Sequence, residues 1–253
     1  MKATALEFRF RYLLHVVIFV LGFTAPWDQW LHLDTIRTWQ LLAAWISRAG
    51  WLGFSAATIT VLMFGVVCAF VAAALRTWAS AYLGASVVHD STMNGDRVVA
   101  AGPYRWVRNP LYLGTIIHTL ALALLMPPSG AVLTIVLIAV LQLRLIGAEE
   151  SFLAVKLGEA YRAYCSRVPR LLPALTPRVA ASQARPAWGT AFFGELYMWG
   201  AFLSFAVLGW RYNALLITQG VLVSLGVSMV ARAFIPKPQT AAERERDGAT
   251  SQS

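Results

Sequence analysis

The chain has 253 residues, of which 58% are hydrophobic and only 13% are charged. Soluble domains carry about 25% charged residues, so this composition excludes an ordinary soluble domain and indicates an integral membrane protein. The formal net charge is +9, but the basic residues border long apolar runs. This placement favours contact with anionic membrane lipids over binding of nucleic acid.

Six apolar runs come close to the length of about 20 residues that a helix needs to cross a bilayer. In chain order, the predicted spans are Tyr12–Ala25, Trp51–Leu75, Leu111–Met126, Gly130–Gly147, Trp188–Gly209 and Ala214–Ile235. Between the first two, Asp34–Trp51 is amphipathic and aromatic, which predicts an interfacial or re-entrant helix. We therefore expect an all-α integral membrane protein with about six transmembrane helices.

The distribution of lysine and arginine predicts the orientation of these spans. With the N-terminus inside, only Arg37, Arg48 and Arg211 of the 21 basic residues fall in outer segments. Because inner loops are enriched in Lys and Arg, we expect both termini to be cytoplasmic, in the inner membrane of a bacterium. Residues 236–253 are charged, which predicts a disordered tail.

The segment Gly102–Gly114, with the sequence GPYRWVRNPLYLG, is a doubly basic turn that leads into the third predicted span. Only Pro127-Pro128-Ser129 separates the third and fourth spans, so the residues before one and after the other should meet on one membrane face. These residues are Tyr104, Arg105, Arg108, Asn109, Tyr112, Arg144, Glu149 and Glu150. Guanidinium groups, carboxylates and aromatic rings together suit a zwitterionic amino acid attached to an aromatic base.

Four motifs in this order resemble the isoprenylcysteine carboxyl methyltransferase family over residues 75–173. They are Gly102–Gly114, Arg144 followed by Glu149-Glu150, residues 157–164 (LGEAYRAY) and Val168-Pro169-Arg170. That family consists of integral-membrane enzymes that use S-adenosylmethionine, and phospholipid N-methyltransferases are its relatives. The resemblance implies an N-terminal membrane part (1–75), a methyltransferase-like core (76–173), a linker (174–187) and two additional transmembrane helices (188–235).

The resemblance also implies a cofactor pocket in a cytoplasmic helix and loops of the core. Its expected residues are Gly102, Tyr104, Arg108, Asn109, Pro110, Tyr112, Glu149, Glu150, Tyr161 and Tyr164. Prenylcysteine enzymes usually have Arg-His-Pro where this chain has Arg108-Asn109-Pro110. Asparagine can still exchange hydrogen bonds with an adenine edge but does not titrate near neutral pH. This difference leaves the identity of the acceptor open.

Arg144 and Glu195 are the residues that we expect to act on the acceptor. A carboxylate acceptor needs an arginine to orient it, whereas an amine or a thiol needs a base. Glu195 lies seven residues into the fifth predicted span, where an acid usually faces a cavity or a partner. It therefore either lines an acceptor pocket or pairs with a tyrosine or an interfacial arginine.

The expected function is transfer of the methyl group of S-adenosylmethionine to a lipophilic acceptor such as an isoprenylcysteine carboxylate, with O-, N- and S-methylation open. One alternative is an NADPH-dependent membrane reductase of the steroid-reductase type, although Glu149-Glu150 disfavours a 2′-phosphate. Another is a non-catalytic membrane scaffold or transporter. No histidine pair has metal-ligand spacing, so we expect no metal site; the oligomeric state is not indicated.

Overall fold

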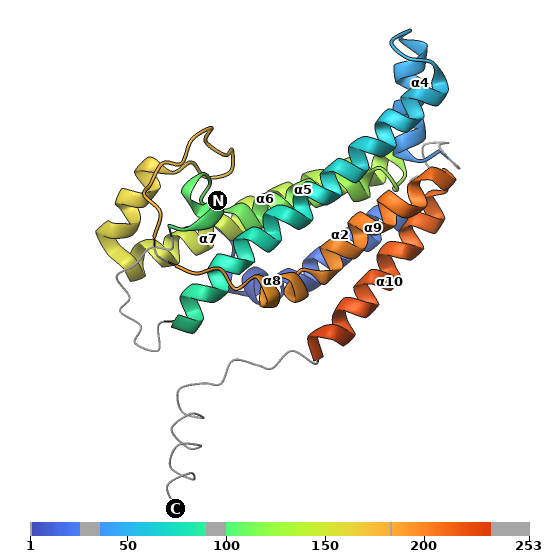
Figure 1. The fold of residues 1–253 in the computed structure, drawn as a ribbon. Coiled ribbons are helices and arrows are strands. Elements are labelled where there is room, and N and C mark those ends of the chain that lie inside the picture. Colours follow the sequence, from blue (N-terminus) through green and yellow to red (C-terminus); the bar gives the residue numbers. More distant parts are fainter. Residues whose placement is uncertain (1, 26–35, 90–99, 183, 234–253) are drawn as a thin grey trace, which may run out of the picture.

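A computed structural model of the chain describes residues 2–25, 36–89, 100–182 and 184–233. These residues form helices and connecting segments, with no β-strand among them. Figure 1 shows the long helices lying alongside one another in an elongated bundle. The predicted all-α fold is therefore confirmed, while the predicted tail 236–253 lies outside the described residues.

The helices occupy all six of the predicted apolar runs. In chain order they are α1 (Ala5–Arg9), α2 (Arg11–Thr24), α4 (Thr38–Arg48), α5 (Phe54–His89), the 3-10 helix η1 (Gly102–Arg105), α6 (Pro110–Ala123), α7 (Pro128–Arg167), α8 (Trp188–Gly194), α9 (Leu196–Leu208), the 3-10 helix η2 (Gly209–Arg211) and α10 (Ala214–Ala233). Proline begins both α6 and α7, where its missing N–H has no helical partner to lose.

Three described helices are long and apolar enough to cross a membrane, in the ranges Phe54–Leu83, Pro128–Arg167 and Ala214–Ala231. The pair α8 and α9 makes a fourth if the two are counted as one span. The apolar helices α2 and α6 have 14 residues each, which is about 21 Å of helix against a hydrocarbon core of about 30 Å. By length and composition, three to four of the described helices are thus candidate spans, and six crossings stay a prediction.

Two helices differ from the sequence prediction around a pair of charged residues. The second span was expected to end at Leu75, but α5 continues to His89 and carries Arg76 within its apolar range. The fifth span was expected to be continuous, but it breaks at Glu195 and bends by 64°. The two charged residues at these positions meet, because Arg76 and Glu195 form an ion pair at 2.7 Å inside the bundle.

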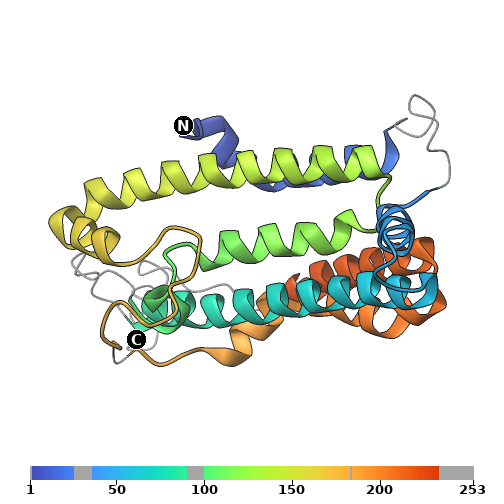
Figure 2. The same cartoon turned by 90° about the horizontal axis from the view of Figure 1, so that it is seen from above.

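Helix α4 lies at one end of the bundle, as Figures 1 and 2 show. Thr38 donates hydrogen bonds to the Met126 carbonyl from its backbone N (2.9 Å) and its hydroxyl (2.8 Å), which fixes α4 to the turn between α6 and α7. The elements that carry Arg37, Arg48 and Arg211 lie at this end, whereas η1 and the C-terminal part of α7 lie at the other. The three arginines that the sequence places outside therefore lie at the end of the bundle opposite the motif.

The largest buried cluster joins the central helices to the last two. Small residues such as Ala69, Ala121 and Ala201 lie in it beside Phe205 and Ile217. Alanines at helix contacts let backbones approach closely, as membrane helix packing requires. Helices α9 and α10 consequently share one core with α5, α6 and α7.

Candidate functional site

The two halves of the predicted site meet at the carboxylate of Glu150, which is buried with 9% exposure. Asn109 Nδ2 donates to Glu150 Oε1 at 3.0 Å, and Arg170 Nε donates to Oε2 at 2.9 Å. Arg108 Nε lies 3.5 Å from Oε1 as an ion pair. The hydrogen bond with Glu150 raises the pKa of the Arg170 guanidinium. The carboxylate of Glu150, on α7, thus connects the turn before α6 with the segment that follows α7.

The segment after α7 is fixed on the same turn by its backbone. The Arg108 N–H donates to the Pro169 carbonyl at 2.9 Å, and Asn109 Nδ2 also donates to the Arg170 carbonyl at 3.1 Å. A hollow of about 440 Å³ opens beside this contact, and its lining includes Arg108, Arg167 and Arg178. Arg108 is therefore shared between the buried Glu150 cluster and a basic hollow.

Glu149 and Tyr112 form a second contact between α6 and α7, in which the Tyr112 hydroxyl donates to Glu149 Oε2 at 2.7 Å. Gly102 begins the turn with φ +52°, and a Cβ at this position would lie 2.3 Å from the ring of Tyr82. Only glycine fits both conditions, because a positive φ is unfavourable for other residues. Pro110 then begins α6 directly after the turn.

The tyrosines of the predicted pocket pack on this turn from α7. Gly158 breaks the helix with φ +57°, and the chain beyond it returns toward η1. The Tyr164 hydroxyl donates to the Tyr104 carbonyl at 2.8 Å, and the rings of Tyr161 and Tyr164 lie 6.0 Å apart. Burial raises the pKa of the Tyr104 hydroxyl above its usual range. The structure therefore brings together all ten residues of the predicted pocket in one region at the end of the bundle.

Arg144 lies on α7 before this region and has a different partner. Its Nε and Nη2 donate to Glu7 Oε1 and Oε2 at 3.0 and 2.7 Å. The Arg144 carbonyl also accepts from the Ala3 N–H at 2.9 Å. Arg144 therefore fastens the N-terminal segment to α7, and its Nη1 is the donor that Glu7 leaves unused.

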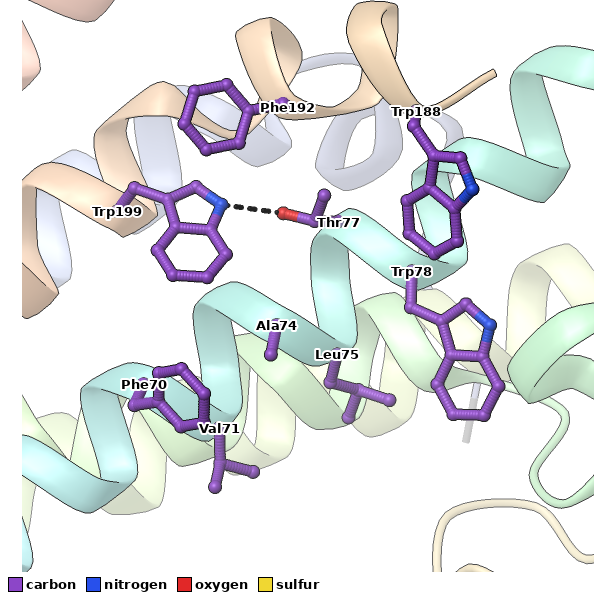
Figure 3. Close-up of a pocket in the computed structure, with 9 residues that line it drawn as sticks. All are labelled: Phe70, Val71, Ala74, Leu75, Thr77, Trp78, Trp188, Phe192 and Trp199. Carbon is purple, nitrogen blue, oxygen red and sulfur yellow. Dashed lines mark hydrogen bonds between the residues drawn. The ribbon is translucent and has the colours of Figure 1, made fainter. Parts of the chain in front are cut away.

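An apolar groove of about 650 Å³ lies between α5 and the α8–α9 pair, as Figure 3 shows. It is lined by Phe70, Val71, Ala74, Leu75, Thr77, Trp78, Trp188, Phe192 and Trp199. Within it, the Trp199 indole N–H donates to the Thr77 hydroxyl at 2.9 Å. The Trp199 indole N–H is thus satisfied by a side chain of the opposite wall.

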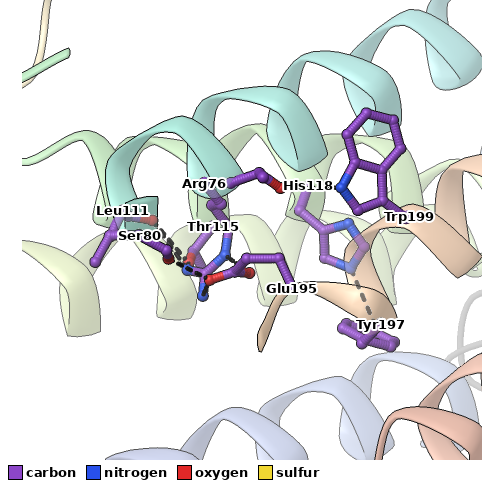
Figure 4. Close-up of polar contacts among 9 residues, drawn as sticks. Arg76, Ser80, Leu111, Thr115, His118, Glu195, Tyr197 and Trp199 are labelled. Carbon is purple, nitrogen blue, oxygen red and sulfur yellow. Dashed lines mark hydrogen bonds and ion pairs between the residues drawn. The ribbon is translucent and has the colours of Figure 1, made fainter. Parts of the chain in front are cut away.

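Glu195 lies at the break between α8 and α9 and is buried with 6% exposure. Arg76 donates to both its oxygens, from Nε to Oε2 at 2.7 Å and from Nη2 to Oε1 at 3.0 Å. Ser80 donates to Oε1 at 2.9 Å, and the Arg76 Nη1 donates to Thr115 at 2.9 Å (Figure 4). Of the two possibilities left open by the sequence, the structure shows pairing with an arginine.

Sequence reasoning missed two arginines that complete these clusters. Arg170 belongs to the motif Val168-Pro169-Arg170, so its place in the resemblance was a signal for a role beside Glu150. Arg76 stands at the end of an apolar run, as many anchoring arginines do. The signal for its role as an ion-pair partner was Glu195, an acid inside a predicted span that needs a partner. Gly114 is part of the same arrangement, since a Cβ there would lie 2.5 Å from Arg76 Cγ.

No curated protein and no solved structure matches this chain. Residues 59–160 match the family described as phospholipid methyltransferase, which is related to the isoprenylcysteine carboxyl methyltransferases. The matched stretch contains Arg76, the motif Gly102–Gly114 and Glu149-Glu150, and it ends before Arg170 and Glu195. The resemblance noted in the sequence is thereby confirmed: residues 59–160 of this chain are similar to the phospholipid methyltransferase family.

Proposed function

We propose that the protein transfers the methyl group of S-adenosylmethionine to a lipophilic acceptor within the membrane. The observation that carries the proposal is the buried Glu150 carboxylate, held by Asn109 and Arg170 beside Arg108. This carboxylate connects the turn before α6 with the segment after α7, and both belong to the motifs of the resemblance. A pocket of this kind at the end of a membrane bundle suits a polar cofactor and an apolar acceptor together.

The donors and acceptors of this region fit the cofactor. Arg108 lines the basic hollow as well as pairing with Glu150 through Nε at 3.5 Å, so its guanidinium can also serve a carboxylate. Glu149 uses Oε2 for Tyr112, which leaves Oε1 for an ammonium group. When bound, S-adenosylmethionine supplies an electrophilic methyl group on its sulfonium. The aromatic faces of Tyr104, Tyr161 and Tyr164 suit the adenine ring, while Gly102 and Pro110 shape the backbone around it.

The chain's own task in methyl transfer is alignment of the acceptor and exclusion of water. We place Arg144 and Glu195 on the acceptor side, each oriented by its ion-pair partner. In this proposal the pocket faces the cytoplasm and the acceptor enters from the inner leaflet. An isoprenylcysteine carboxylate is one such acceptor, and lipid amines and thiols are others.

The proposal is tested by calorimetric titration of the detergent-purified protein with S-adenosylhomocysteine, with NADPH as the parallel ligand. We expect saturable binding of the first and none of the second. Arg108→Ala should weaken binding about 10-fold to 100-fold, because a hydrogen bond to a charged group contributes about 1.5–3 kcal/mol. Arg162→Ala is the matched control, since Arg162 is an arginine of α7 whose side chain is 66% exposed.

Two results would contradict the proposal. Binding of NADPH alone would identify a reductase. Absence of binding of both ligands, in protein shown to be folded by circular dichroism, would favour a scaffold without a cofactor.

A further inference from the structure

The groove between α5 and the α8–α9 pair has the character of a binding site for a hydrocarbon chain. Its volume of about 650 Å³ lies within the roughly 300–1,000 Å³ typical of ligand pockets. Aromatic rings dominate its walls, and the Trp199 indole N–H is already bound to Thr77 (Figure 3). A polar ligand would find few hydrogen-bonding groups here, whereas a hydrocarbon chain has no hydrogen bonds to give up when it enters.

The depth of the groove in the bundle supports the same occupant. Its α5 wall runs from Phe70 to Trp78, about 12 Å of helix, and belongs to the membrane-spanning range Phe54–Leu83. It is the half of that range nearer the motif, not the half nearer α4. A groove at this depth faces lipid chains, since the bilayer core holds almost no water.

Two packed tryptophans connect one end of the groove with the motif Gly102–Gly114. The ring of Trp78, in the groove wall, lies 5.5 Å from the ring of Trp106. Trp106 belongs to the motif Gly102–Gly114 and its carbonyl accepts from the Ala174 N–H at 2.9 Å. One end of the groove is therefore part of the same packed region as the turn that carries Arg108.

The opposite wall comes from helices outside the family region. Trp188 and Phe192 precede the bend and Trp199 follows it, while the match ends at residue 160. The ion pair between Arg76 and Glu195 holds the bend against α5, and the Ala187 N–H donates to the Ala81 carbonyl at 2.9 Å. Both contacts fix the distance and angle of this wall.

We infer that this groove binds the hydrocarbon chain of the methyl acceptor, with α8 and α9 supplying one wall of the acceptor site. The inference rests on the proposed function, because it names where the acceptor of that reaction is held. The acceptor class it specifies is a lipid with at least one long apolar chain. The reacting head group would then lie beyond Trp78, at the motif end of α5.

The test is photolabelling of the full-length protein in nanodiscs that contain phosphatidylethanolamine with a diazirine in its palmitoyl chain. We expect labelled peptides from residues 70–78 and 188–199 in several-fold excess over the lipid-exposed face of α10 around Leu222 and Val223, which are 60% and 66% exposed. Ala74→Trp fills the groove and should remove this excess. Ala56→Trp, at an exposed position of the same helix outside the groove, should retain it.

A second variant and a second readout keep the result unambiguous. Trp188→Ala removes a half-exposed wall residue and should also lower groove labelling, without filling the groove. S-adenosylhomocysteine binding is measured on every sample and should be the same for Ala74→Trp as for the unchanged chain.

The inference is overturned if the groove is labelled no more than α10, or if Ala74→Trp labels like Ala56→Trp. Groove labelling in a protein that binds no S-adenosylhomocysteine would instead contradict the proposed function, so the two failures are distinguishable.

Discussion

Glu150 is a carboxylate that faces two arginines and one amide in a largely buried position. Its side chain is 11% exposed, that of Arg108 16% and that of Arg170 47%. Burying a charge is costly unless it is paired and hydrogen-bonded, and here both oxygens have donors. The arrangement fixes where Arg108 lies relative to α7, and hence the shape of the proposed cofactor pocket.

Glu150→Gln should destabilise the fold as well as weaken cofactor binding. The change leaves Arg108 and Arg170 without this counter-charge. Removal of one partner from a buried ion pair costs about 3–5 kcal/mol of stability. Because water reaches the half-exposed Arg170, we expect a smaller loss of about 2 kcal/mol. Glu159→Gln is the matched control, because Glu159 lies on the same helix with its side chain 83% exposed. Thermal unfolding in detergent measures the stability of both variants. Equal unfolding midpoints for Glu150→Gln and Glu159→Gln would show that the Glu150 cluster does not stabilise the fold.

The residue types of the site were readable from the sequence, but their partners were not. Glu149-Glu150 and the turn at Arg108 were expected to meet, and they do. The assignment of Arg170 to Glu150 depends on how the chain returns after α7. That return is a tertiary arrangement, which residue type and spacing do not encode locally.

At the scale of elements, α7 is a single predicted helix that the structure divides at Gly158. The sequence predicts helix through to Arg167, and the helix does end there. The turn within it was not predicted, because an isolated glycine in a helical pattern is usually tolerated without a break. The break matters for the site, since Tyr161 and Tyr164 lie beyond it and pack against Tyr104.

Gly158→Ala should therefore destabilise the protein through backbone conformation alone. The position has φ +57° and ψ −133°, and no atom lies within 4 Å of an added Cβ, so strain of about 1–3 kcal/mol is expected without a steric clash. Gly226→Ala also meets no atom within 4 Å, but lies within α10, where alanine should stabilise by about 0.5–1 kcal/mol. Unfolding midpoints shifted in opposite directions confirm this account; a shared direction would refute the role of the turn.

At the scale of the whole molecule, the apolar runs determine where helices form but not how the last two attach. The linker after α7 reads as a polar connection, yet it lies along the motif: the Arg178 N–H donates to the Arg105 carbonyl at 2.9 Å, and Arg105 Nε donates to the Val179 carbonyl at 3.0 Å. Hydrogen bonds between segments distant in sequence leave no local pattern. The same is true of Arg76 and Glu195, which lie 119 residues apart.

The Arg76–Glu195 ion pair attaches the α8–α9 pair to the region that matches the family model, and a double-mutant cycle measures its strength. Arg76→Met and Glu195→Gln each leave one buried charge unpaired, so each should cost about 3–5 kcal/mol, and the double variant should cost much less than their sum. The exposed pair Arg162→Met and Glu159→Gln should be additive to within about 0.5 kcal/mol.

Methyl transfer by the double variant then separates the two roles of Glu195. If the carboxylate only positions α8 and α9, restored stability restores activity. If it contacts the acceptor, activity stays lost in a protein that folds and binds S-adenosylhomocysteine. Additive losses in the Arg76–Glu195 cycle would show that the α8–α9 pair is held by the apolar core around Phe205, and that the bend at Glu195 does not depend on Arg76.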